Sequence, residues 1–274
     1  MGEDASATGA VGPPEAQPAA SPAAGWTPGR FEGRTAVVTG AGSGIGRATA
    51  VRLAREGARV VAVELLADRL DALVAEHGDL DLVPVAADVT TTEGVDAVVA
   101  AAAGRVDALA NVAGIMDGFL PPAEVDDATW DRVLAVNLTA PMRLCRAVLP
   151  GMVGAGAGAV VNVASEAALR GSAAGAAYTA SKHGLVGLTK NIAVMHRAQG
   201  VRANAVAPGP VATGIDAPMR SAQAAGVVGP LLQAVLTAPA QAEDLAASIC
   251  WLLSDDAANV NGVVLASDGG WSAV

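Results

Sequence analysis

The stretch TGAGSGIG, residues 39–46, decides the fold of this chain. It follows a short apolar run and leads directly into a helical pattern, Ile45–Glu56. Glycines in such a turn let the backbone bend sharply and approach a pyrophosphate, whose charge the N-terminus of the helix meets. The spacing G-x-x-x-G-x-G differs from the G-x-G-x-x-G dinucleotide fingerprint, and tight turns also use glycines for steric reasons. The turn alone is therefore equally consistent with a phosphate site and with a purely structural bend.

Outward from this turn, short apolar runs alternate with helical patterns along the chain. The runs that predict strands are Ala36–Thr39, Val60–Val63, Leu82–Ala86, Ala108–Val112, Ala159–Val163, Ala203–Val206 and Val263–Ala266. The helical patterns between them are Ile45–Glu56, Leu66–His77, Thr92–Ala103, Asp127–Met152, Ala177–Arg197 and Glu243–Leu253. Strands this apolar, each followed by a helix, belong in a parallel sheet covered on both faces. We therefore predict an α/β chain with a Rossmann-type, doubly wound three-layer αβα fold and a seven-stranded parallel sheet.

Two segments stand outside this alternation. Residues 1–30 are rich in Ala, Pro and Gly and have no apolar periodicity. They predict a flexible N-terminal tail before a single domain, residues 31–274. The stretch Gly209–Ala242 is rich in Gly, Pro and small apolar residues, and we expect it to form an excursion outside the sheet.

Composition and charge exclude several classes of function. The chain of 274 residues has 17 Lys and Arg against 27 Asp and Glu, a net charge of −10. This charge repels nucleic acid backbones and anionic membrane surfaces. No uncharged run forms a continuous apolar helix of about 20 residues, and the N-terminus lacks the apolar core of a signal peptide. With Cys145 and Cys250 expected as buried free thiols, we predict a cytoplasmic enzyme or binding protein.

Polar residues follow the second, third and fourth predicted strands. Glu64, 18 residues after Gly46, is placed to accept hydrogen bonds from the ribose hydroxyls of an adenosine. A solvated carboxylate at a helix start fits the same position equally well. Asp88-Val89 and Asn111–Gly114 end the next two strands, on the edge where doubly wound folds bind ligands.

Tyr178 and Lys182 form the candidate acid/base pair. Tyr178 is the only tyrosine, and the spacing of four residues places both side chains on one helix face. A nearby ammonium lowers the pKa of a phenol from its usual value near 10, so the pair can act in general acid/base catalysis. An exposed tyrosine and lysine that merely share a helix surface give the same pattern.

Ser165 and Asn137 complete the set of candidate catalytic residues. Ser165 lies just past the fifth predicted strand, where its hydroxyl can bind a substrate oxygen held by the tyrosine. Asn137 is a polar amide among apolar neighbours and needs a partner if it is buried; a proton-relay water is one candidate. Either residue alone is also typical of a satisfied structural polar group. No group of His, Cys and carboxylates has metal-ligand spacing, so no metal is expected.

Taken in order, these motifs resemble the short-chain dehydrogenase/reductase family from Gly33 to about Trp271. The resemblance rests on the turn at 39–46, Asp88-Val89, Asn111-Val112-Ala113-Gly114, Asn137, Ser165, Tyr178-x-x-x-Lys182, Pro208-Gly209 and Asp268-Gly269-Gly270. It implies that Tyr178 is the proton donor and acceptor, and that Lys182 lowers the tyrosine pKa and binds the nicotinamide ribose. Ser165 would orient the carbonyl or alcohol, and Asn137 would hold the relay water.

The resemblance also implies a nicotinamide cofactor. Its binding residues would be Gly40, Ser43, Gly44, Ile45, Gly46, Glu64, Asp88, Val89, Asn111, Ala113, Gly114, Tyr178, Lys182, Pro208, Val211 and Thr213. A carboxylate at Glu64 repels a 2′-phosphate, and the next residues, Leu65 and Leu66, bring no compensating cation. We therefore expect NAD, with NADP the less favoured cofactor.

Two departures from the family pattern concern single positions. Val112 stands where many members have a second asparagine. Glu166 directly follows Ser165, where small residues are more common, and either faces away from the pocket or adds a negative charge near the substrate.

The predicted function is that of an NAD-dependent oxidoreductase that interconverts a secondary alcohol and a ketone. Segments Gly114–Met116, Ala167–Leu169 and Ile215–Leu232 would line a pocket for an apolar small molecule. In relatives, the helices corresponding to Asp127–Met152 and Ala177–Arg197 pair across a twofold axis, which implies a homotetramer. The alternatives are a 3-oxoacyl-[acyl-carrier-protein] reductase, which the few basic residues disfavour, and a non-catalytic dinucleotide-binding scaffold.

Overall fold

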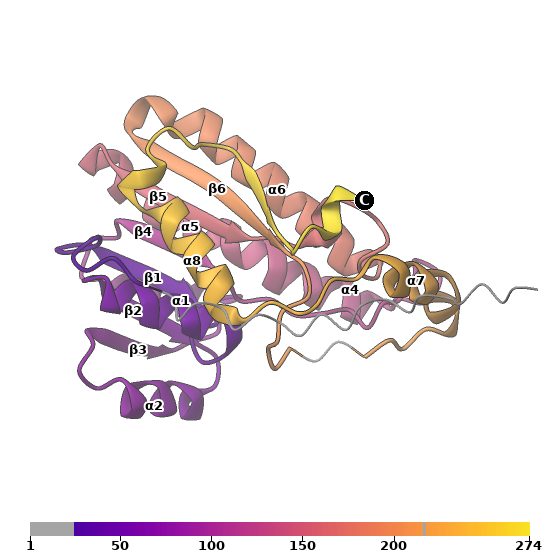
Figure 1. The fold of residues 1–274 in the computed structure, drawn as a ribbon. Helices are drawn as coiled ribbons and strands as arrows, with labels where there is room; N and C mark the ends of the chain where they lie inside the picture. Colours follow the sequence, from indigo (N-terminus) through magenta and orange to yellow (C-terminus); the bar gives the residue numbers. More distant parts are fainter. Residues whose placement is uncertain (1–24, 216–217) are drawn as a thin grey trace, which may run out of the picture.

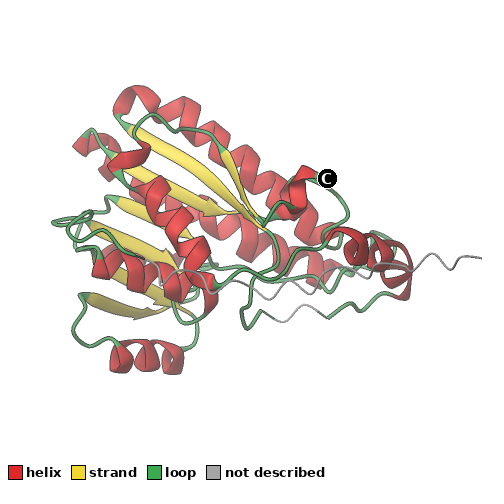
Figure 2. Cartoon of the chain, in the orientation of Figure 1, coloured by secondary structure: helices red, strands yellow, loops and turns green. Residues whose placement is uncertain are grey.

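The computed structural model describes residues 25–215 and 218–274. Seven parallel strands form one sheet in the order β3-β2-β1-β4-β5-β6-β7, with helices on both faces (Figures 1 and 2). The strands are β1 Thr35–Thr39, β2 Arg59–Glu64, β3 Leu82–Ala86, β4 Ala108–Asn111, β5 Gly158–Val163, β6 Val201–Pro208 and β7 Val264–Ser267. The helices are α1 Gly44–Arg55, α2 Ala67–Glu76, α3 Thr92–Ala101, α4 Asp127–Leu134, α5 Ala140–Ala155, α6 Ala176–His196, α7 Ala222–Val235 and α8 Ala242–Leu253. The predicted Rossmann-type three-layer fold is confirmed.

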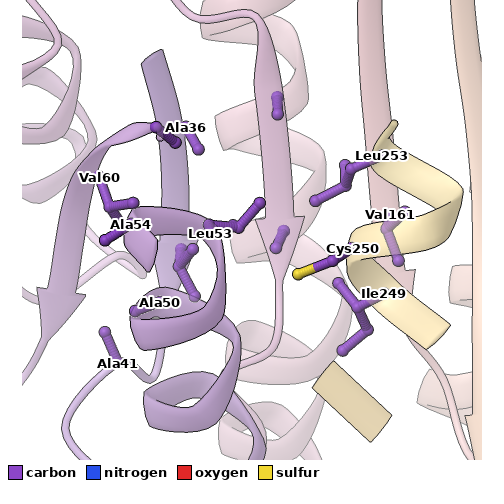
Figure 3. Packing of buried hydrophobic residues seen from close by; sticks show 14 of the residues in the cluster. Ala36, Ala41, Ala50, Leu53, Ala54, Val60, Val161, Ile249, Cys250 and Leu253 are labelled. Carbon is purple, nitrogen blue, oxygen red and sulfur yellow. The ribbon is translucent and has the colours of Figure 1, made fainter. Parts of the chain in front are cut away.

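Strand β1 shows how the alternating side chains divide the core. Val37 faces the layer that includes α5, while Ala36 and Val38 face the layer of α1 and α8. Figure 3 shows the layer formed by α1 and α8, where small residues such as Ala50 let these helices lie close to the strands. Helices therefore bury both faces of the sheet, which explains why the strands are almost continuously apolar.

Two predicted elements differ from the structure. The helix expected at Asp127–Met152 is interrupted by a π-helical turn, Ala135–Thr139, and continues to Ala155. The expected excursion contains a helix, α7, which begins after Ser221 and accommodates Pro230 within its length. The Ser221 hydroxyl accepts a hydrogen bond from the Ala224 amide, and this cap lets a glycine- and proline-containing segment become helical.

The last residues of the predicted tail contact the folded domain. Residues 1–24, the larger part of the expected tail, lie outside the described residues. The Thr27 amide donates to the Glu56 carboxylate, and the Arg30 guanidinium pairs with it at 2.7 Å. Phe31 is fully buried in the core. Residues 27–30 therefore belong to the domain, because they neutralise a buried carboxylate at the end of α1.

The sheet has its switch point between β1 and β4. Strand β1 pairs with β2 on one side and with β4 on the other, so the connections run in opposite directions from this point. Ligands of doubly wound folds bind in the crevice that this reversal opens at the carboxyl ends of the strands. In the described part of the chain, no helix has the length and apolar character needed to cross a membrane.

Candidate active site

The glycine turn after β1 has a backbone conformation that residues other than glycine rarely adopt. Gly40 and Gly44 have φ values of +68° and +49°. A Cβ atom at Gly46 would lie 2.1 Å from the carbonyl oxygen of Gly40. The turn is held to the end of β4 because the Thr39 hydroxyl accepts hydrogen bonds from the Val112 and Ala113 amides at 3.0 and 3.1 Å.

The N-terminus of α1 is open to an anion. Its N-cap residue, Ser43, makes no side-chain capping hydrogen bond within the described chain, and the first turn of α1 carries no acidic residue. The first N–H groups of a helix lack partners inside the helix, and the helix dipole favours negative charge there. The turn therefore fits a pyrophosphate group on both backbone shape and electrostatics.

A cavity of about 830 Å³ lies along this edge of the sheet. Of the predicted cofactor residues, those that line it are Gly40, Ser43, Gly44, Ile45, Gly46, Glu64, Asp88, Val89, Ala113, Gly114 and Thr213. The volume is within the usual range for a small-molecule site. Asn111, Pro208 and Val211 do not line the cavity, and neither do the predicted catalytic residues.

Glu64 at the end of β2 is fixed by three backbone amides. Its Oε2 atom accepts a hydrogen bond from the Gly42 amide at 3.2 Å, and Oε1 accepts from the Leu65 and Leu66 amides at 2.9 and 3.3 Å. The carboxylate thus links the glycine turn to the start of α2. Its position at the cavity agrees with the predicted ribose contact.

One cation beside Glu64 was missed by the sequence reasoning. Arg69, in the first turn of α2, lines the cavity, whereas Arg47 forms an ion pair with Glu76. The sequence contained a signal for Arg69, because the third residue of the helix that follows β2 can lie on the side of that helix that faces the glycine turn. A Cβ atom at Gly42 would lie 2.7 Å from the Arg69 Cβ, which shows how closely α2 approaches the glycine turn.

Three predicted cofactor residues outside the cavity have structural contacts. The Asn111 side chain donates to the Asn162 side-chain oxygen at 2.8 Å, and Asn162 donates in turn to the Thr189 hydroxyl at 2.8 Å. This buried chain of hydrogen bonds ties β4, β5 and α6 together. Pro208 is the last residue of β6, and Val211 forms a bridge with Ala240.

Tyr178 and Lys182 lie together in the first two turns of α6, just behind the cavity wall. The Lys182 Nζ atom is 5.4 Å from the centroid of the Tyr178 ring and donates to the Val163 carbonyl at 2.8 Å. A Cβ atom at Gly114 would lie 3.4 Å from the same Nζ. Since Gly114 lines the cavity, the lysine lies next to a residue of the cavity wall.

Burial dominates the acid/base properties of this pair. It raises the pKa of Tyr178 to about 12, although a hydrogen bond with Ser165 lowers it and the charge of Asp117 raises it. Burial also lowers the pKa of Lys182 to about 8. The predicted lowering of the tyrosine pKa by the Lys182 ammonium stays a prediction, which burial of both groups opposes.

Ser165 is the second residue after the end of β5 and is hydrogen-bonded to the Tyr178 hydroxyl. Its Oγ atom also accepts a hydrogen bond from the Ala167 amide at 3.1 Å, which begins a short 3₁₀ turn. The structure therefore brings together the serine, the tyrosine and the lysine that the spacing predicted.

Asn137 is buried in the π-helical turn, and its side-chain amide already has protein partners. It donates to the Ile115 carbonyl at 2.9 Å and to the Ser181 hydroxyl at 3.2 Å, and it accepts from the Ile115 amide at 2.9 Å. These bonds hold the loop after β4 against α6. The relay water stays a prediction. The hydrogen bonds of the Asn137 side chain agree with the alternative of a satisfied structural polar group.

Glu166 faces away from the cavity, which agrees with the first of the two sequence alternatives. It is fully buried, lies 2.9 Å from the Arg170 Nε atom and shares a hydrogen bond with the Asp268 carboxylate. Burial raises the pKa of Glu166, and Asp268 raises it further, whereas the charge of Arg170 lowers it.

The substrate side of the cavity differs from the predicted one. Ala167–Leu169 do not contribute, whereas α4 does, and the residues on this side are Ile115, Met116, Asp117, Gly118, Thr129, Arg132, Val133, Ala135, Val136, Gly214, Ile215, Pro218 and Arg220. Within the predicted segment Ile215–Leu232, Asp216 and Ala217 lie outside the described residues. The contribution of α4 was missed because its pattern was assigned wholly to an interface between subunits.

Comparison with known proteins gives a consistent result. The family model for short chain dehydrogenases matches residues 34–224. A short-chain dehydrogenase/reductase from Penicillium canescens is 40% identical over 260 residues, which are 90% of this chain and 99% of the relative. A 3β-hydroxysteroid dehydrogenase from Eggerthella lenta is 41% identical over 250 residues, covering 88% and 95%.

Solved structures of similar chains agree with the observed architecture. Levodione reductase superposes with a TM-score of 0.80 at 36% identity, over 89% of this chain and 99% of that one. A putative NAD(P)-dependent gluconate 5-dehydrogenase from Beutenbergia cavernae, with NADP bound at low occupancy, gives 0.78 at 39% identity, over 90% and 100%.

Proposed function

The chain belongs to the short-chain dehydrogenase/reductase family, an oxidoreductase family that uses NAD(P), and from this premise we propose that it interconverts an apolar secondary alcohol and its ketone, with NAD as the preferred cofactor. One observation carries the proposal. Ser165, Tyr178 and Lys182 meet behind Gly114, at the wall of a cavity that begins at the glycine turn.

The residues present fit a dinucleotide. The open N-terminus of α1 would receive the pyrophosphate, Glu64 the adenosine ribose, and Asp88 with Val89 the adenine side. Gly114 would border the nicotinamide, and Thr213, whose Cγ2 atom is 2.9 Å from the position of a Cβ at Gly44, would contact the cofactor beside the glycine turn. When bound, the cofactor supplies or accepts the hydride, and the protein contributes binding, orientation and the path of the proton.

Tyr178 moves the proton at its hydroxyl oxygen. With its pKa raised to about 12, the phenol is protonated at neutral pH and is ready to donate to a carbonyl oxygen during ketone reduction. Ser165 holds this hydroxyl by a hydrogen bond and orients the same substrate oxygen. In the reverse direction the phenolate accepts the alcohol proton, so oxidation is favoured at alkaline pH.

Lys182 sits between the tyrosine ring and the cavity wall. Its pKa of about 8 leaves most of the side chain protonated at neutral pH. In that form it donates to the Val163 carbonyl and is close enough to Gly114 to bind a ribose hydroxyl across it. Its charge also stabilises the phenolate whenever the tyrosine gives up its proton.

The substrate side supports an apolar, ring-shaped molecule. Met116, Val133, Ile215 and Pro218 line it, and half of the Ile215 side chain is exposed to it and to solvent. One relative is named for a 3β-hydroxysteroid and one solved structure for levodione, which supports the same substrate class. Apolar surface of this kind favours burial of hydrocarbon over binding of a polyanion.

We also propose that the protein is a homotetramer. On the outer face of α6, Val194 and Met195 are 63% and 64% exposed. Apolar side chains on the helix that relatives use for pairing support a covered surface. Light scattering at micromolar concentration should give about four times the chain mass, and a monomer mass would contradict the assembly.

The experiment that tests the function is a substrate panel. Cyclohexanol, cyclohexanone, a 3-hydroxysteroid and an acetoacetyl thioester are each incubated with NAD(H) and NADP(H), and the reduced nicotinamide absorbance is followed. The ring alcohols and ketones should turn over with NAD(H). Turnover of the thioester alone would support the acyl-carrier alternative, and cofactor binding without any turnover would support the scaffold.

Tyr178→Phe is the matched control for this assay. The variant should fold and bind NAD, since only a hydroxyl is removed, yet it should lose about 10²–10⁴-fold in turnover. A variant that keeps a tenth of the normal rate would contradict the role of Tyr178 as the acid/base.

A further inference from the structure

The catalytic helix α6 begins at a residue that cannot cap it. Its N-cap is Gly175, which has no side chain, and the first turn carries no acidic residue. The first amides of a helix need acceptors, which the N-cap side chain usually provides. In this chain the acceptors come from a different part of the fold.

Asp117, in the loop after β4, takes the place of the missing cap. Its Oδ2 atom accepts a hydrogen bond from the Tyr178 amide at 2.9 Å, and Oδ1 accepts from the Gly175 amide at 3.1 Å. The side chain is only 2% exposed. These two amides are the ones that a reciprocal capping box satisfies from within a helix.

Gly175 is required by this arrangement. A Cβ atom there would lie 2.5 and 2.6 Å from the two Asp117 oxygens and 2.5 Å from the Leu120 amide nitrogen. The Ala176 amide also donates to the Leu120 carbonyl at 2.9 Å. The start of α6 is thus built around the loop that enters it, and the two segments cannot separate without losing three hydrogen bonds.

The same loop is held in an unfavourable backbone conformation. Phe119 has a φ of +58°, in the left-handed region that non-glycine residues rarely adopt, and it follows Gly118 at +70°. The Phe119 amide donates to Asp117 Oδ1 at 3.1 Å. Asp117 therefore stabilises the turn as well as the helix, and strain of this kind persists where surrounding contacts hold it.

The loop that contains Asp117 also contacts the substrate side of the cavity. The Arg220 amide donates to the Gly118 carbonyl at 2.9 Å, and a Cβ at Gly118 would lie 2.8 Å from the Arg220 Cδ atom. Asp117, Gly118 and Arg220 all line the cavity. A change in the position of the segment around Arg220 is thus transmitted to Asp117, and from there to the backbone of Tyr178.

We propose that Asp117 is a positioning residue for catalysis. From the loop after β4 it caps helix α6, which carries Tyr178. It thereby fixes the Tyr178 backbone relative to the segment around Arg220. The proposal rests on the function proposed above for Tyr178. Asp117 touches the reacting tyrosine only through its main chain, so it acts by geometry and by its charge.

The charge of Asp117 gives the role a signature beyond stability. The groups that face the Tyr178 hydroxyl and ring are Ser165 after β5, Lys182 on α6 and Asp117 in the loop, with Arg220 packed on the far side of that loop. Burial raises the pKa of Tyr178 most, the Ser165 bond lowers it, and the Asp117 charge raises it. Removal of that charge should therefore shift ionisation of the phenol to lower pH.

The test compares Asp117→Asn with Asp126→Asn. Asp126 caps α4 through a single bond from the Thr129 amide, and asparagine keeps such a cap. At Asp117 the bonds fall on both oxygens, and the asparagine NH₂ group would face an amide donor instead of accepting from it. Both variants lose one negative charge at a helix N-terminus, but Asp117 is 2% exposed whereas Asp126 is exposed, so the two substitutions differ in burial as well as in helix and geometry.

Asp117→Asn should lower kcat for the ring alcohol turned over fastest by about tenfold or more, since small displacements of a catalytic group are costly. The rise of its oxidation rate with pH should begin at lower pH than in the unmodified protein. Asp126→Asn should match the unmodified protein in both measurements. An Asp117→Asn profile that coincides with that of Asp126→Asn would overturn the proposal.

Asp117→Glu covers the case in which the asparagine variant does not fold. It keeps the charge and both acceptor oxygens but moves them by one methylene, so kcat should fall while the pH at which oxidation rises stays unchanged. An unchanged kcat in this variant would also overturn the proposal. If instead Tyr178→Phe retains activity, the proposed function has failed, and that result is distinct from a failure of the Asp117 role.

Discussion

The glycine turn and the excursion after β6 lie on the same edge of the sheet but are built in opposite ways. The turn, residues 39–46, is fixed by positive φ angles, by the Thr39 hydroxyl and by the buried carboxylate of Glu64. The excursion, residues 209–240, is joined to the rest by separated contacts, such as the Val211–Ala240 bridge and the Arg220–Gly118 hydrogen bond.

The two regions also differ in what they expose. Apart from Ile45, the residues of the turn that line the cavity are glycines or have small side chains, so they offer backbone amides. The excursion exposes large apolar side chains, namely Ile215, Val227, Leu231 and Leu236. A rigid backbone suits the binding of a pyrophosphate, whose shape is constant. Exposed side chains on a segment with few contacts to the rest of the fold can be substituted without loss of the fold. We therefore expect the glycine turn to govern cofactor selectivity and the excursion to govern substrate selectivity.

Gly46→Ala and Gly226→Ala test most directly whether the glycine turn is rigid and the excursion tolerates substitution. A Cβ at Gly46 would meet the Gly40 carbonyl at 2.1 Å, whereas at Gly226 in α7 no atom of the described chain lies within 4 Å. Gly46→Ala should abolish NAD binding and lower the melting temperature by many degrees. Gly226→Ala should leave both unchanged or stabilise α7 by up to about 1 kcal/mol, because alanine favours helix more than glycine does.

Calorimetric titration with NAD and a thermal melt of each variant measure both effects. Normal NAD affinity in Gly46→Ala would show that the turn yields, and the contrast between a rigid and an adaptable region would then be wrong.

The sequence predicted the rigid region far better than the adaptable one. Glycine spacing and apolar strands are local signals, and they located the turn, Glu64 and the seven strands within two residues. The sequence also predicted that the three proposed catalytic residues come together, because helical spacing is local as well: Tyr178 and Lys182 share a face of α6, and Ser165 follows a strand end.

What escaped prediction depends on contacts between distant segments. The cap of α6 by Asp117 spans 61 residues, and no spacing rule points to it. The burial that raises the pKa of Tyr178 to about 12 is likewise a property of the folded chain. Helix α7 was missed for a different reason, since Pro230 and two glycines argued locally against it while the Ser221 cap acts in its favour.

Ile215→Asp tests the adaptable side by itself. Ile215 lines the cavity and is 48% exposed, so the substitution removes an apolar contact and adds an unpaired charge near the substrate. The KM for a ring alcohol should rise about 30-fold, or about 2 kcal/mol. The NAD affinity and the melting temperature should stay unchanged.

Leu236→Asp is the matched control, because Leu236 is also 48% exposed but does not line the cavity. Steady-state kinetics should show an unchanged KM in this variant. Equal effects of the two substitutions would mean that the excursion acts through general stability and not through substrate contact.

The smallest expected effect concerns the glycine turn, where we expect the carboxylate of Glu64 to favour NAD over NADP. Glu64 is held in place by the Gly42, Leu65 and Leu66 amides, so it cannot swing away from a 2′-phosphate without leaving three donors unpaired. Two like charges about 4 Å apart near a protein surface repel by about 4 kcal/mol, and screening and relaxation reduce this value. NAD should therefore be preferred in kcat/KM by at least about tenfold, or about 1.4 kcal/mol.

Glu64→Ser combined with Leu65→Arg should narrow or reverse this preference. Serine removes the repelling charge, and arginine at the exposed position 65 can pair with a phosphate in bidentate geometry. The loss of an acceptor for three amides will weaken both cofactors, so the measured quantity is the ratio of kcat/KM for NAD to that for NADP, in which the common loss cancels. Arg69→Ala, which removes the cavity-lining cation, is the control and should leave the ratio near its original value. If Arg69→Ala raises the NAD preference, Arg69 already offsets a phosphate. If the unmodified protein prefers NADP, the ribose role of Glu64 is wrong, while the catalytic role of Tyr178 is unaffected.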